Sequence, residues 1–211
     1  MADIGENQER SAWNRCGDML GVLPFDSFVV FAVHDLFQGL RLDHAFGGAL
    51  ALAYYAEPRG TVDVDVNVFV TFDRAVEVVA ALETLGFTPE QAAEEWSPAA
   101  GVRLRRPGDP TRLDLFFSLN ERYDETARRT QRFPFGRRRR RLPFLSAEDL
   151  VVFKLSFGRD KDWVDLRHLL EAQPAIDLTY VETQLVALRG PTMYPRLARL
   201  RVIARRARGE G

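Results

Sequence analysis

Residues 44–70 read HAFGGALALAYYAEPRGTVDVDVNVFV, and this stretch decides the fold. A short apolar run breaks at Gly47 and Gly48, and the Ala/Leu-rich segment behind it favours a helix up to about Ala56. A proline two residues later ends that helix. Over residues 62–70 valine occupies every second position, a period of two that predicts a half-buried strand. The stretch therefore predicts a strand-to-helix turn followed by a strand with two carboxylates on its polar face.

These carboxylates belong to Asp63 and Asp65. Side chains two residues apart on a strand point the same way, about 7 Å apart, so both can reach one divalent ion or a close pair of ions. Hard oxygen ligands suit Mg²⁺ or Mn²⁺, and a Gly-Gly turn lets a phosphate approach bare backbone N–H groups at a helix N-terminus. Together the two features predict a metal-phosphate site. Taken singly, such glycines often serve close packing, and such aspartates are often only solvated.

The spacing of these residues resembles a known hallmark. The motif R-x-T-x-D-h-D is formed by Arg59, Thr61, Asp63, Val64 and Asp65. With the small-residue turn and helix before it, it resembles the DNA polymerase β-like nucleotidyltransferase superfamily, whose pattern is hG[G/S], a spacer and Dh[D/E]h. The form here looks like the bacterial AbiEii-type and related minimal nucleotidyltransferases. The resemblance implies that Asp63 and Asp65 hold Mg²⁺, that Gly47 and Gly48 line the phosphates of an NTP, and that Arg59 and Thr61 brace the D-x-D strand beside the nucleotide.

A third carboxylate lies further along the chain. Residues 102–106 and 112–118 read as strands joined by a turn at residues 107–110, which makes a hairpin. Asp114 lies on the face opposite the apolar ridge of the second strand. Superfamily members carry a third carboxylate on a neighbouring strand, so the resemblance implies that Asp114 completes the metal site and accepts a proton from the acceptor. The alternative is an ion pair with Arg112 or another exposed arginine.

Residues 148–170 read EDLVVFKLSFGRDKDWVDLRHLL and follow a start at residues 146–149 that resembles a capping box. The pattern predicts two helices separated by a glycine, and it again resembles the AbiEii-type family, where a lysine-bearing helix and an R-x-K-D-x-x-D-L segment follow the catalytic sheet. Lys154 and Lys161 are the only lysines of the chain. The resemblance makes them candidates to bind the leaving pyrophosphate. The alternative for Lys161 is an ion pair with Asp165, one turn further on.

The remaining elements carry no such motif. Further helices are predicted at residues 7–21, 26–41, 72–85, 120–132, 177–189 and 191–208. The helix at 26–41 has Asp26 or Ser27 as its cap and four apolar anchors, namely Phe28, Phe31, Leu36 and Phe37. We read His34 as a helix-face residue and His44 as a strand-entry residue. The arginine run at 137–141 reads as a solvated loop or as a contact with nucleic acid.

The fold class expected is α/β (α+β), a small mixed sheet flanked by helices. A nucleotidyltransferase core with the N-terminal helices would cover residues 1–145, and a C-terminal helical subdomain packed on it would cover residues 146–211. A chain of 211 residues can bury a core of this size.

Composition narrows the setting. The lone Cys16 excludes an intramolecular disulfide and a cysteine metal cluster, and the N-terminus has no apolar signal-peptide core, so we expect a cytoplasmic protein. No apolar run approaches the roughly 20 residues that a membrane span needs. Residues 1–100 carry 5 basic and 16 acidic side chains, and residues 101–211 carry 24 and 14. This asymmetry indicates either a half that faces nucleic acid or two halves that neutralise each other across an internal interface.

The sequence thus predicts Mg²⁺-dependent transfer of a nucleoside monophosphate from an NTP to a hydroxyl acceptor. AbiEii-type toxins modify tRNA ends, so the resemblance and the basic second half imply a tRNA or other RNA acceptor and an antitoxin protein as a partner. A small molecule such as an aminoglycoside, or a protein, is the alternative acceptor and needs an acidic or neutral pocket. A non-catalytic nucleotide-binding regulator is a further alternative, against which the three carboxylates argue.

Overall fold

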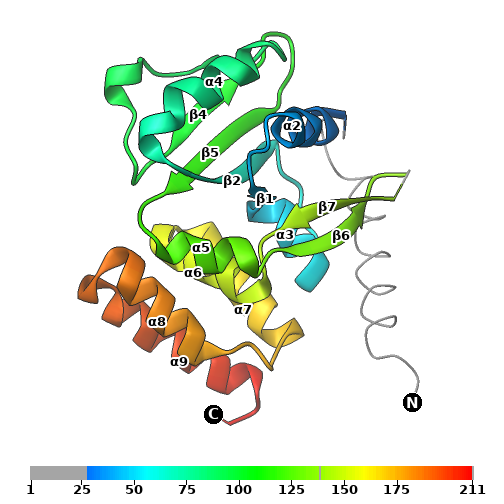
Figure 1. Cartoon of the computed structure of the whole chain (residues 1–211). Helices are drawn as coiled ribbons and strands as arrows, with labels where there is room; N and C mark the ends of the chain where they lie inside the picture. Colours follow the sequence, from blue (N-terminus) through cyan, green and yellow to red (C-terminus); the bar gives the residue numbers. More distant parts are fainter. Residues whose placement is uncertain (1–27, 138, 211) are drawn as a thin grey trace.

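The computed structural model describes residues 28–137 and 139–210 (Figure 1). The helix predicted at 7–21 and both candidate caps of the next helix lie outside the described residues. In chain order the elements are α2 (Phe28–Gly39), β1 (His44–Phe46), α3 (Gly48–Tyr55), β2 (Asp63–Thr71), α4 (Ala75–Glu83), β3 (Thr88–Pro89), β4 (Val102–Arg105), β5 (Arg112–Ser118), α5 (Arg122–Arg128), β6 (Gln131–Phe135), β7 (Arg140–Phe144), α6 (Ala147–Phe157), α7 (Asp160–Ala172), α8 (Leu178–Arg189) and α9 (Tyr194–Ala207). Short 3₁₀ turns cover Phe72–Arg74, Ala93–Glu95 and Pro191–Met193.

The strands of the described residues form one seven-stranded mixed sheet in the order β3-β4-β5-β2-β1-β7-β6. The pairs β2–β5 and β1–β7 are parallel, and the remaining pairs are antiparallel. Eight α-helices accompany this sheet within the same residues. The predicted α/β class with a mixed sheet is confirmed.

The two strands that carry the carboxylates, β2 and β5, are neighbours near the centre of the sheet. Val64, Val66 and Val68 of β2 are fully buried, because every second residue of the strand faces the core. The apolar ridge of β5 is buried on the same side. Asp65 lies directly opposite Asp114 in the β2–β5 register. The polar faces of both strands therefore lie next to each other.

Three of the four predicted anchors of helix α2 contact the core, because Phe37 is buried and Phe31 and Leu36 pack against it while partly buried. Its buried apolar residues are Val29, Val30, Val33 and Phe37. Phe28, predicted as an anchor, is 63% exposed, so that prediction was wrong. The β-branched residues of this helix fill the core in its place.

The segment after β5 also differs from the prediction. The helix predicted at 120–132 ends at Arg128, and the chain forms the β6–β7 hairpin, which joins the sheet where Phe46 of β1 pairs with Phe144. Both hairpin strands contain a proline and few consecutive alternations, which hid the strand pattern. The end of the arginine run is therefore strand: Arg140 and Arg141 belong to β7.

The last four helices form a layer of their own. Ser146 caps α6 by accepting a hydrogen bond from the Asp149 N–H at 3.1 Å, as the capping pattern predicted. In Figure 1, α8 and α9 lie on the side of α6 and α7 that faces away from the sheet. The domain division at residue 145 stays a prediction. Among the described residues, no helix has both the length and the apolar character that crossing a bilayer requires.

Candidate active site

A pocket opens where β2 and β5 meet the first turn of α3 and the junction of α6 with α7. Its empty space is about 550 Å³ with the open mouth included. The lining residues are Gly48, Arg59, Thr61, Asp63, Asp65, Asn67, Asp114, Phe116, Leu145, Leu150, Phe153, Lys154, Phe157, Arg159, Lys161 and Asp162. Eight of the nine site residues predicted from the sequence line this one pocket, and Gly47 does not.

The two glycines have different surroundings. Gly48 has φ of +53°, and a Cβ atom placed on it would lie 1.7 Å from Asp65 Oδ2. Glycine is therefore required here both by the backbone conformation and by the close approach of the carboxylate. The Gly47 N–H donates a hydrogen bond to the Asp65 carbonyl oxygen at 2.8 Å, so it serves the backbone. Gly48 begins α3, and the free N–H groups of that first turn are the ones next to the pocket.

Three carboxylates bring negative charge close together at the pocket. Burial, followed by repulsion from Asp114 and Asp63, raises the pKa of Asp65 to about 6, although Lys154 acts in the opposite direction. Asp63 Oδ1 and Asn67 Oδ1 are buried oxygens without a hydrogen-bond partner among the described residues. Oxygens in this state favour a ligand that carries positive charge or donates hydrogen bonds.

Asp114 is held by an arginine. Arg103, its register neighbour on β4, donates two hydrogen bonds to the Asp114 carboxylate at 2.6 and 2.7 Å. The hydrogen bonds to Asp114 are the main reason why the pKa of Arg103 is raised. The sequence left open an ion pair with Arg112, but Arg112 approaches Glu90 at 3.9 Å. The structure therefore contains the alternative ion pair, with Arg103 as the partner.

The residues present fit a divalent ion in part. Within the described residues no three His, Cys, Asp or Glu side chains are gathered as a ready metal site. Asp114 directs both of its carboxylate oxygens to Arg103. Asp63 and Asp65 fit, because they share a strand face, because Asp63 has an unpartnered oxygen, and because a cation would relieve the repulsion between them. Asp114 can bind a metal ion only after its ion pair with Arg103 is broken. The Arg103 side chain is 42% exposed and has room to move away.

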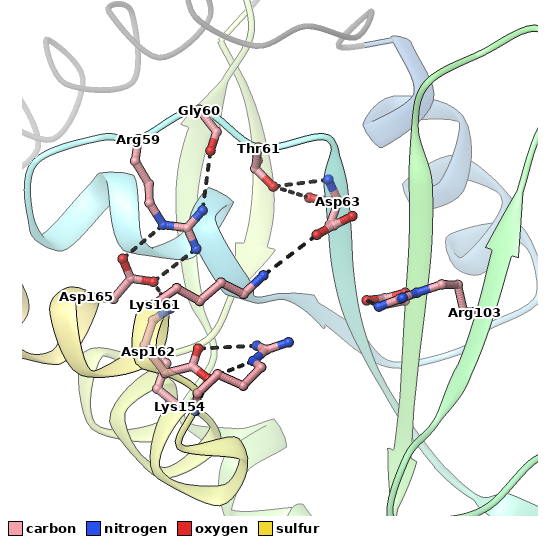
Figure 2. Close-up of polar contacts among 11 residues, drawn as sticks. Arg59, Gly60, Thr61, Asp63, Arg103, Lys154, Lys161, Asp162 and Asp165 are labelled. Carbon is pink, nitrogen blue, oxygen red and sulfur yellow. Dashed lines mark hydrogen bonds and ion pairs between the residues drawn. The ribbon is translucent and has the colours of Figure 1, made fainter.

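Cations line the side of the pocket formed by α6 and α7. Lys154 is only 4% exposed, and its Nζ donates to Asp165 Oδ2 at 2.6 Å. Arg59 donates two hydrogen bonds to the same carboxylate, at 2.9 and 3.0 Å (Figure 2). Burial opposes ionisation of Asp165, yet these hydrogen bonds and charges outweigh it and lower its pKa. Asp165 therefore positions both cations.

Lys161 does not pair with Asp165. Figure 2 shows it reaching from α7 toward β2, with its Nζ 4.0 Å from Asp63 Oδ2. The Thr61 hydroxyl accepts a hydrogen bond from the Asp63 N–H at 3.0 Å and thus fixes the start of β2. Lys161 is about half exposed, so it is the more mobile of the two lysines.

Three residues beside the site were missed from the sequence: Arg103, Phe116 and Phe157. Phe116 follows Asp114 by two positions and so shares its strand face, a signal that alternation alone carries. The rings of Phe116 and Phe157 lie 5.4 Å apart at 56°. Both are only partly buried. The pairing of Arg103 with Asp114 depends on the β4–β5 register, which the sequence does not specify.

Comparison with solved structures shows which proteins share this fold. A search of solved structures finds the same arrangement in nucleotidyltransferases, at a level of similarity that establishes the fold alone. One is the solution structure of the antibiotic-resistance factor ANT(2'')-Ia, with 15% identity, a TM-score of 0.52 and coverage of 82% of this chain and 94% of that chain. Another is the crystal structure of ANT(2'')-Ia with adenylyl-2''-tobramycin, with 15% identity, a TM-score of 0.54 and coverage of 78% and 97%. No protein-family model matches the chain, and the search of curated proteins finds no match either.

Proposed function

We propose that the chain transfers a nucleoside monophosphate from an NTP to a hydroxyl acceptor. The observation that carries the proposal is the placement of Asp63, Asp65 and Asp114 on two neighbouring strands, with all three lining one pocket. The same pocket contains the start of helix α3 and four cationic side chains. The combination suits a metal-bound triphosphate, and the fold is one that nucleotidyltransferases use.

Asp63 and Asp65 would hold Mg²⁺ or Mn²⁺, which neutralises charge on the triphosphate when it is bound. Lys161 is exposed and mobile, so it can leave Asp63 and follow the departing pyrophosphate. Arg59 and Lys154 are fixed by Asp165 and supply a stationary positive field. The N–H groups at Gly48 and after it complete the phosphate cradle.

The acceptor hydroxyl must lose a proton as it attacks. Asp114 lies next to Asp65 in the sheet register and is the carboxylate least committed to the metal. It becomes an acceptor for that proton once Arg103 moves aside, and Arg103 is well enough exposed to do so. The guanidinium then lies beside the acceptor and favours one that carries phosphate.

Phe116 and Phe157 form the wall on which we place the base of the NTP. Their partly exposed rings lie against each other at the pocket, and Phe157 also lies under the Arg159 guanidinium at 5.0 Å. A flat aromatic surface next to a phosphate cradle suits a nucleobase, because stacking is worth about 1–3 kcal/mol per base. In this proposal the base of the nucleotide lies on the aromatic wall, and its triphosphate lies at the carboxylates.

For the acceptor we propose RNA, in line with the AbiEii-type resemblance and with an antitoxin protein as the expected partner. Among the described residues that line the pocket, the only acidic one besides the three carboxylates assigned to chemistry is Asp162, and Arg159 already binds it. An aminoglycoside is a polycation and would find no free carboxylate for its amines. The cationic lining favours an anionic acceptor.

Two measurements test the nucleotide site. MgATP should raise the melting temperature, because a ligand that binds only the folded state stabilises it, whereas Phe157→Leu should weaken MgATP binding about tenfold. Phe157→Leu should leave the binding of magnesium tripolyphosphate, which has no base, unchanged. If Phe157→Leu weakened the binding of both ligands equally, the placement of the base on this aromatic wall would be wrong. No binding of either ligand to the parent protein would reject the function.

The acceptor is tested by incubating the protein with labelled NTPs and Mg²⁺, first with total tRNA and then with aminoglycosides. We expect label on RNA and none on the antibiotics. Label on an antibiotic alone would replace the RNA proposal with the small-molecule acceptor.

A further inference from the structure

A second polar pocket lies at the opposite end of β1 and β2. Its floor contains His34 from α2 and His44 from β1, whose ring nitrogens His34 Nδ1 and His44 Nε2 are 2.9 Å apart. The two residues are only 2% and 6% exposed. His44 pairs with Val68, near the end of β2, whereas Asp63 and Asp65 lie at its start. This histidine pair therefore belongs to a different site from the carboxylates.

The hydrogen bonds fix the tautomers of both rings. His44 Nδ1 lies 2.9 Å from the Leu42 carbonyl oxygen, which can only accept, so Nδ1 carries the proton. Burial lowers the pKa of His44, and burial together with His44 lowers that of His34 to about 4, so both rings are neutral near pH 7. His44 Nε2 is then an acceptor, and His34 Nδ1 must donate to it. The proton-free Nε2 of His34 remains and has no partner among the described residues.

Three arginines line the same pocket as His34, together with a single acidic residue, Asp43, among the described residues. The pocket has about 940 Å³ of empty space with its mouth included, and it is lined by Arg41, Arg128 and Arg132 from three separate segments. Arg41 has φ of +54°, an unfavourable conformation for a residue with a side chain, and its guanidinium has no ion-pair partner within residues 28–137 and 139–210. Arg128 binds Glu125, and Arg132 donates to the Arg141 carbonyl oxygen.

We propose that this pocket binds a hydroxylated phosphate ester, with the phosphate at the arginines and a hydroxyl donating to His34 Nε2. Guanidinium groups suit phosphate oxygens. The phosphate group of a monoester, as a dianion, has no proton to donate to the imidazole lone pair, so the hydroxyl group that donates to it must lie elsewhere on the ligand. A metal ion fits poorly, because the two imidazoles are hydrogen-bonded to each other. Among the described residues, no group of three or more possible metal ligands is present either.

The first experiment compares ribose 5-phosphate with inorganic phosphate and with ribose by calorimetry. We expect ribose 5-phosphate to bind at least tenfold more tightly than either fragment. Arg41→Gly should weaken that binding at least fivefold without lowering stability, because glycine adopts a positive φ readily. Arg139→Gly is the matched control, since Arg139 also has a positive φ of 50° but does not line this pocket. Equal binding in both variants, or no binding to the parent protein, would overturn the proposal.

Two further arms sharpen the result. Asp63→Asn should retain ribose 5-phosphate binding, because that residue belongs to the other pocket, and a loss there would place the ligand in the candidate active site instead. Histidine ¹⁵N spectra should show Nε2 of His34 unprotonated in the free protein and shifted by the ligand. A protonated Nε2 would contradict the assignment. If a short oligoribonucleotide binds and the matching oligodeoxyribonucleotide does not, the phosphate ester recognised by the pocket comes from RNA. If ribose 5-phosphate binds and neither oligonucleotide does, the ligand is a free metabolite.

Discussion

Gly48 is the residue on which the geometry of the site depends most directly. Gly48→Ala would place a methyl group 1.7 Å from Asp65 Oδ2 on a backbone with φ of +53°. We expect a loss of at least about 2 kcal/mol in the free energy of unfolding, because backbone strain and displacement of the carboxylate both add to the cost. Urea denaturation measures it.

The matched control is Gly39→Ala. Gly39 ends α2 and has no atom within 4 Å of the position of an added Cβ, so alanine there should be neutral or slightly stabilising. If Gly48→Ala were as stable as Gly39→Ala, the close approach of Asp65 to the turn would be contradicted.

Asp65 allows a test of charge without any substrate. Its folded-state pKa of about 6 lies above the usual 3.8, so the folded protein holds a proton between these values that the unfolded chain has lost. Stability from this group is therefore full below pH 3.8, falls as pH rises through the window, and is lost above about 6. In metal-free buffer at pH 7.5, Asp65→Asn should raise the free energy of unfolding by about 1–3 kcal/mol. In a separate assay with Mg²⁺ and NTP, the same variant should show no transfer. A variant less stable than its parent at that pH would contradict the cost of burying the Asp65 carboxylate beside Asp114 and Asp63.

At the scale of secondary-structure elements, the sequence pattern predicted the features that depend on residues close together in the chain. The alternation in β2 and β5 and the Gly-Gly turn fixed which side chains share a face, so the carboxylates could be placed from the sequence. The burial of Lys154 could not be predicted from the neighbouring residues, because it depends on the position of α6 in the centre of the molecule, where every residue from 149 to 155 is buried. The β6–β7 hairpin and the partner of Asp114 depend on register between distant segments, which periodicity does not encode.

The network of Arg59, Lys154 and Asp165 joins α6, α7 and the segment before β2. Asp165→Asn would leave the buried Lys154 ammonium without a carboxylate, at a cost of about 3 kcal/mol. The double variant Asp165→Asn with Lys154→Met should recover most of that loss, because the unpaired charge is then gone. Asp160→Asn, an exposed change on the same helix, is the control. Losses that simply add in the double variant would contradict a buried charge pair as the link between these helices.

At the scale of the whole molecule, the charge asymmetry is partly used internally. Cations of the second half meet acids of the first at Arg140 with Asp35, at Lys161 with Asp63 and at Arg112 with Glu90. The guanidinium of Arg140 also lies over the Phe31 ring at 5.1 Å. Part of the arginine run therefore fastens the β6–β7 hairpin to α2, and a role for the run in RNA contact stays a prediction for the arginines of the turn.

The central claim is that Asp63 and Asp65 support nucleotidyl transfer, and one measurement tests it most directly. The parent protein, Asp63→Asn and the surface control Asp73→Asn are incubated with α-labelled NTPs, Mg²⁺ and total tRNA, and label in the acceptor is counted. We expect transfer by the parent and by Asp73→Asn. We expect at least a thousandfold less from Asp63→Asn, about 4 kcal/mol of barrier. Equal transfer by Asp63→Asn and its parent would contradict the account.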